Sequence, residues 1–130
     1  MNTTIDDLDA ALRSDGASTV LAGAWEALDL GVRVADAVTW DGSGDELLAL
    51  TAAQECAAAR ALLPLPATGQ PLPLDPVDIS AGADGLAPFA ALLDRAHRAL
   101  AGLAEGDAQL TAATHHAAAA AAALAAVREQ

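Results

Sequence analysis

The sequence predicts an all-α protein: a four-helix bundle made of two helical hairpins, joined by a long proline-rich crossover strap and preceded by a short extra N-terminal helix. Of the 130 residues, 37 are Ala and 20 are Leu, the residues that lose least on entering a helix. β-Branched and aromatic residues, which favour strands, are scarce. Apolar residues recur at steps of three and four, as on one face of a helix. The length suits one helical domain spanning residues 1–130 with one core.

The first two elements are a short helix over residues 4–13 and a long helix over 19–39. The short helix has one apolar face, and aspartates fill its electropositive first turn. Gly23 and Gly31 lie inside the long helix, where each costs about 1 kcal/mol relative to Ala. One explanation is the close approach of a neighbouring backbone at these positions. The apolar stripe of the long helix is Leu21, Trp25, Leu28, Val32 and Ala35, and the opposite face is Glu26, Asp29, Arg33 and Asp36.

The third helix is predicted over residues 44–63. Ser43 and Glu46 have the spacing of a capping box at its start, and Pro64 ends it because proline lacks an amide donor. Two apolar stripes run side by side along this helix. The first is Leu47, Leu50, Ala57 or Ala58 and Ala61, and the second is Leu48, Ala52, Cys56, Ala59 and Leu63.

Residues 64–83 hold five of the six prolines, which excludes a helix. Apolar residues recur among these prolines, and a purely solvated linker would not need them. We therefore expect an extended strap packed along the helices, with a flexible linker as the alternative. Fully extended, the segment reaches roughly 60 Å, whereas an 18-residue helix is roughly 27 Å long, so the strap is long enough to cross the bundle.

The last two helices are predicted over residues 87–104 and 107–128, separated by Gly106 and Asp107. The first of them has the clearest apolar stripe, and the second contains seven consecutive alanines, Ala117 to Ala123. Alanine is the best helix former, so this run indicates helix and not disorder. The stripe of the first is Phe89, Leu92, Leu93, Ala96, Leu100 and Leu103, and that of the second is Leu110, Ala113, Ala117, Leu124 and Val127.

The charge balance argues against two classes of partner. The chain carries 18 acidic residues and six basic ones, all Arg, for a net charge of −12. Nucleic-acid binding needs clustered basic residues, and acidity repels anionic membranes, so we expect neither nucleic acid nor membrane as a partner. The N-terminus lacks the basic region of a signal peptide. A cytoplasmic protein is therefore expected.

The arginines have mostly local explanations. Three acid–arginine pairs are spaced four residues apart in the favourable order, which stabilises a helix by about 0.2–0.5 kcal/mol for each pair. Arg60 lies near a helix C-terminus, where a cation is favourable. Only Arg95 lacks an evident role within its own helix. The three pairs are Asp9 with Arg13, Asp29 with Arg33, and Asp94 with Arg98.

Motifs for catalysis or cofactor binding are absent from the sequence. A carboxylate-bridged di-metal bundle needs Glu-x-x-His on two helices, and neither His115 nor His116 has Glu three residues before it. No metal or other cofactor is therefore predicted. His97, with His115 or His116, could meet across the core as a pH-sensitive contact or weak metal site; the alternative is that the histidines face water. Trp40 either closes its hairpin or stays exposed as an interaction anchor.

These observations favour a protein that is not an enzyme. We expect an accessory or regulatory module that acts through protein–protein contact, with a protein partner or a second copy in a homodimer. The Ala-rich faces of the last helix exceed what a four-helix core needs, which supports this interpretation. The alternative is a small-molecule-binding bundle or enzyme, with a pocket of roughly 300 Å³ or more under the proline-rich strap and near His97, His115 or His116.

Overall fold

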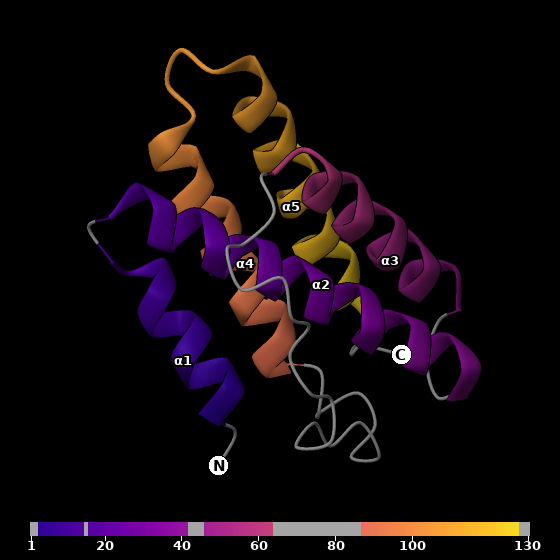
Figure 1. Ribbon diagram of the computed structural model, residues 1–130. Helices are drawn as coiled ribbons and strands as arrows, with labels where there is room; N and C mark the ends of the chain where they lie inside the picture. The colour runs from indigo at the N-terminus through magenta and orange to yellow at the C-terminus, as the bar shows by residue number, and fades with distance from the viewer. Residues whose placement is uncertain (1–2, 15, 42–45, 64–86, 128–130) are drawn as a thin grey trace.

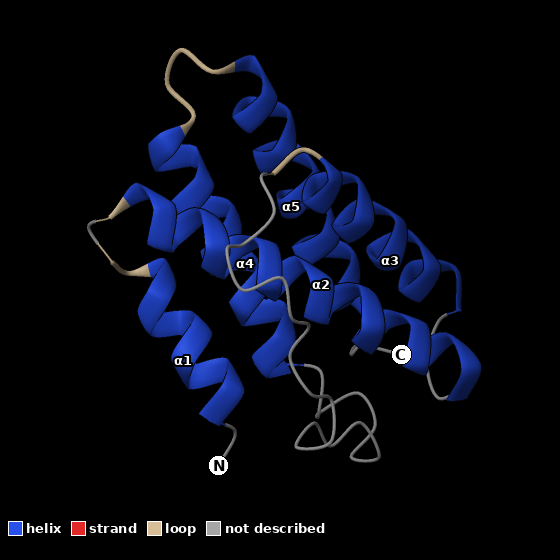
Figure 2. Ribbon diagram, in the orientation of Figure 1, coloured by secondary structure: helices blue, strands red, loops and turns tan. Residues whose placement is uncertain are grey.

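The computed structural model describes residues 3–14, 16–41, 46–63 and 87–127, which contain five helices and no strand (Figures 1 and 2). The all-α prediction is confirmed, and each helix begins and ends within two residues of its predicted bounds. The proposed strap over residues 64–83 lies outside the described residues. The helices are α1 (Thr3–Leu12), α2 (Ala17–Asp41), α3 (Glu46–Ala61), α4 (Ala87–Leu103) and α5 (Ala108–Val127).

Helices α2, α3, α5 and α4 form the bundle in that order around its core. α3 packs on α2 and α5, and α4 packs on the same two helices from the other side. The short α1 lies against both α2 and α4 (Figure 1). The two helices that are consecutive across residues 64–86, α3 and α4, are therefore diagonal partners and not neighbours.

Contacts along α5 give the direction of each helix. At its start, the side-chain Nε2 of Gln109 donates a hydrogen bond of 2.8 Å to the carbonyl of Leu62, just after α3. Near its end, Ala125 lines a groove with Ala90 from the first turn of α4. Both α3 and α4 therefore run antiparallel to α5 and parallel to each other. The C-terminal end of α3 and the N-terminal end of α4 therefore lie at opposite ends of the bundle. The sequence alone did not determine this direction.

The buried side of α2 is broader than predicted and is turned from the expected stripe. Ala24, Ala27 and Gly31 are fully buried or nearly so, whereas Trp25 is only half-buried. The physical reason is that α2 is covered by three helices, and small side chains let them approach closely. A Cβ atom added to Gly31 would lie 2.7 Å from the Sγ atom of Cys56. The closest atoms to this position belong to the side chains of Cys56 and Leu93, and not to a neighbouring backbone.

The same close approach occurs where α1 meets α2. A Cβ atom added to Gly23 would lie 2.9 Å from the Cβ atom of Ala11. The start of α2 differs slightly from the prediction: the helix begins at Ala17, and the carbonyl of Gly16 accepts the first hydrogen bond, 3.0 Å from the amide of Val20. Glycine is well accepted at this capping position.

The apolar stripes of α4 and α5 are buried in the core, except that Leu103 and Leu110 are only partly buried and pack against it. Asp107 caps α5, because its Oδ1 atom accepts hydrogen bonds from the amides of Gln109 at 2.9 Å and Leu110 at 3.1 Å. Gly106, with a φ of 79°, makes the turn before the cap, a conformation that glycine adopts without strain. On α3 only the second predicted stripe is buried, including Ala52, Cys56 and Ala59.

Candidate interaction surface

The outer face of α3 exposes two leucines one turn apart. Leu47 is 76% exposed and Leu50 is 46% exposed. Both belong to the first predicted stripe of α3, which continues along the helix to the exposed Ala61. Single exposed leucines are common on protein surfaces, whereas these two lie next to each other on one helix face and form a small apolar patch. The exposed Glu46 lies at the start of this α3 face.

This surface could have been recognised in the sequence. Two parallel apolar stripes on one helix cover more of its circumference than contact with α2 and α5 requires. The buried stripe faces those two helices, and the other stripe is exposed at Leu47, Leu50 and Ala61. The spacing of the residues predicts both stripes but does not say which neighbouring helix covers each of them.

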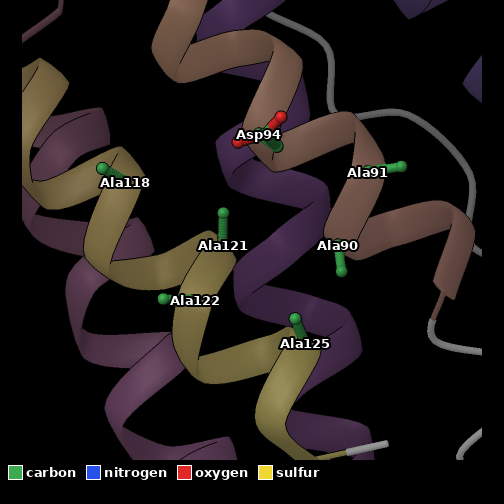
Figure 3. A pocket seen from close by; sticks show the side chains of 7 residues that line it. All are labelled: Ala90, Ala91, Asp94, Ala118, Ala121, Ala122 and Ala125. Carbon is green, nitrogen blue, oxygen red and sulfur yellow. The ribbon is translucent and has the colours of Figure 1, made fainter.

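A shallow groove lies between α4 and α5, with a volume of about 360 Å³. Figure 3 shows its lining side chains on facing stretches of the two helices. Six of the seven are alanines, so the groove exists because small side chains leave space between the helices. The one polar side chain among them is the Asp94 carboxylate. The lining residues are Ala90, Ala91 and Asp94 from α4 and Ala118, Ala121, Ala122 and Ala125 from α5.

The histidines proposed as ligands are not gathered in this groove. On α4, His97 Nε2 lies 3.3 Å from Asp94 Oδ1, and its Nδ1 atom is buried without a hydrogen bond. On α5, His115 is exposed, and His116 Nδ1 lies 2.6 Å from Glu55 Oε2 on α3. His97 and His116 thus each contact a carboxylate. Among the described residues, no group of three His, Cys, Asp or Glu could hold a metal ion. The side chain of Trp40 is not among those that the structure describes.

A charged cluster joins α2 to α3. Asp29 is buried, which corrects its predicted place on the solvent face of α2. Its Oδ1 atom lies 2.6 Å from Arg60 on α3, and its Oδ2 atom lies 3.3 Å from Arg33. The Arg60 guanidinium also lies 5.8 Å from the ring centroid of Trp25, within cation–π range. The role of Arg60 is therefore an interhelical contact.

Ion pairs elsewhere lie both between neighbouring turns of one helix and between two helices. The predicted pairs of Asp9 with Arg13, at 3.2 Å, and Asp94 with Arg98, at 2.9 Å, are confirmed. Arg95, which had no evident partner in its own helix, forms an ion pair with Asp9 and so joins α4 to α1. Sequence spacing reveals pairs within a helix, whereas a pair between helices depends on their packing.

Burial changes the acidity of two side chains. It raises the pKa of the Cys56 thiol to about 12, against a smaller opposing effect of the nearby Arg60. A thiol with so high a pKa stays protonated at neutral pH and is a poor nucleophile. Burial, followed by the charge of Asp29, raises the pKa of Glu26. Neither group lies in the groove between α4 and α5.

Searches of protein families, curated proteins and solved structures find no match to this chain.

The helix α5 is unusually apolar. By length and composition alone, it is the one helix of the described part that could cross a membrane, with a mean hydropathy of 1.3 over its most apolar window. The core helix of a soluble bundle passes the same test, and 39% of that window is buried within the fold.

Proposed function

We propose that this chain is a small acidic module without a reaction of its own, which acts as an accessory or regulatory protein by binding another protein through the outer face of α3. The observation that supports this most strongly is the exposure of Leu47 and Leu50, one turn apart. The partner would present an apolar patch bordered by Lys or Arg. Basic residues would complement Glu46 and the net charge of −12.

The two leucines are large enough to matter for affinity. Burying a leucine side chain contributes about 1.5–3 kcal/mol, and a factor of ten in affinity corresponds to about 1.4 kcal/mol. Losing either leucine would therefore weaken binding by roughly tenfold to a hundredfold. Interfaces commonly depend on a few such residues.

The ionisable groups support a binding role over a catalytic one. Asp9, Asp29 and Asp94 each have an arginine partner, and Glu55 contacts His116. A general base needs a carboxylate or imidazole aimed at a substrate, whereas these groups contact one another. The small-molecule alternative has weaker support, because the groove offers one polar side chain and Asp94 is already engaged by His97 and Arg98.

The proposal is tested with a double variant, Leu47→Glu with Leu50→Glu. Both positions are exposed, so the fold should persist, as circular dichroism would verify. Tagged wild-type protein should retain a specific partner from its native cells, and the double variant should retain at least tenfold less. Ala10→Glu on the exposed side of α1 is the control for added charge. Equal recovery with the double variant and the wild type would refute a binding role for α3.

A further inference from the structure

We propose that the groove between α4 and α5 binds a second copy of this chain, so that α5 of each copy lies in the groove of the other. This site is separate from the α3 face proposed above. The α4–α5 groove is about 360 Å³ in volume, is lined mainly by methyl groups and is open to solvent. Its neighbour, the junction of α2 and α4, is already covered by α1. The bundle therefore accepts a helix along one such seam, and among the described helices none covers the α4–α5 seam in the same way.

The distribution of charge favours a second copy at this face over any other face. A chain of net charge −12 repels its own copy at most approaches. α5 (Ala108–Val127) has no Asp, Glu, Lys or Arg, and α4 has one acid, Asp94, against two arginines. By contrast, three of the ten residues of α1 are aspartates. The α4–α5 face is thus where two acidic copies can meet with the least like-charge repulsion.

The outer surface of α5 has the shape that the groove needs. One set of its outward residues recurs at alternating steps of three and four, the spacing of a helix–helix seam. All are small except the histidine, which lets helix axes come close. A twofold axis along the bundle then places each α5 in the groove of the other copy, with equivalent residues side by side. These residues are Thr111, His115, Ala118, Ala122 and Ala125, each exposed or half-buried.

The available area sets the strength of this contact. α4 and α5 are roughly 26 and 30 Å long, and a face two helices wide offers roughly 600 Å² in each copy. The two copies together would bury roughly 1,200 Å², which is near the lower limit for specific interfaces. One helix alone would offer half as much, so both helices are needed. The expected dimer is weak, with a dissociation constant in the micromolar range.

Two variants of Ala122 test the proposal. An interface of this size is weak, so the measurement needs a high protein concentration. Sedimentation of the wild type at roughly 100 µM should show a dimer, and Ala122→Glu should weaken the dimer at least tenfold. Ala122→Cys should form an intermolecular disulfide on mild oxidation, since equivalent positions lie side by side across the axis. Cys56 is buried and should not react. Ala10→Glu and Ala10→Cys, exposed on α1, are the matched controls.

A strict monomer at that concentration, or a dimer that Ala122→Glu does not weaken, would overturn the proposal. A disulfide yield for Ala122→Cys no higher than for Ala10→Cys would also overturn it. The two proposed surfaces are separable: the Leu47→Glu and Leu50→Glu changes should leave the dimer intact, whereas Ala122→Glu should leave capture of the partner through α3 intact.

Discussion

Alkaline pH should destabilise this protein through a single thiol, that of Cys56. The side chain is fully buried, and burial raises its pKa to about 12 from an ordinary value of 9.0. The chain has neither Lys nor Tyr, and arginine stays charged up to about pH 12 or above. Between about pH 9 and 12, Cys56 is therefore the only side chain expected to lose a proton.

The magnitude follows from the difference in pKa between the folded and unfolded chains. Above pH 9 the unfolded chain loses the thiol proton while the folded protein keeps it, so unfolding becomes more favourable as pH rises. The stability contributed by the protonated thiol is complete below about pH 9 and falls by about 1.4 kcal/mol per pH unit until about pH 12. At pH 11 the expected loss is about 2.5 kcal/mol.

Urea unfolding followed by circular dichroism at several values between pH 8 and 11 measures this slope. The wild type should lose stability steadily above pH 9. Cys56→Ala should be less stable at pH 8, because a buried sulfur is lost, and its stability should be nearly constant up to pH 11. An equal alkaline slope in the two proteins would show that the thiol is not buried as described.

Three other predictions concern packing and ion pairs, each measured by urea unfolding. Gly31→Ala should lower stability by about 1–2 kcal/mol, because the collision of the added Cβ atom with the Cys56 thiol exceeds the gain in helix propensity. A Cβ atom added at Gly102 has open space around it, so Gly102→Ala should raise stability by about 0.5–1 kcal/mol, and equal effects of the two changes would contradict the close approach at Gly31. Asp29→Ala should lower stability by about 2–3 kcal/mol by leaving two arginines without their carboxylate, and a loss no greater than that of exposed Asp36→Ala would refute this. Glu55→Gln removes a partly exposed pair and should lower stability by less than about 1 kcal/mol; a larger loss would show that the pair is more important than its exposure suggests.

Local chemistry explains why the helices could be predicted. Alanine and leucine favour helices, Gly106 and Asp107 end one helix and cap the next, and each spacing of four between acid and arginine gives a pair within a helix. These features depend on residues within a turn or two of one another. They remain valid whatever the arrangement of the helices in space.

The rest depended on which helices are neighbours. Asp29 has the sequence spacing of a solvent-facing residue, and it is buried because α3 supplies Arg60 beside it. The same is true of the contact between His116 and Glu55. The exposure of Leu47 also follows from packing, since the described helices α2 and α5 contact α3 on only part of its circumference. Periodicity finds an apolar stripe but does not say what covers it.

The most direct test of the proposed function is site-specific photo-cross-linking at Leu47 in the native cell. A photoreactive amino acid at this exposed position should form a covalent link to one other protein, and Leu50→Glu in the same chain should remove that link. The same probe at Asp36, exposed on α2, should give no comparable product. Equal products at both positions, or a product at Leu47 that persists with Leu50→Glu, would contradict the proposal that α3 binds a partner.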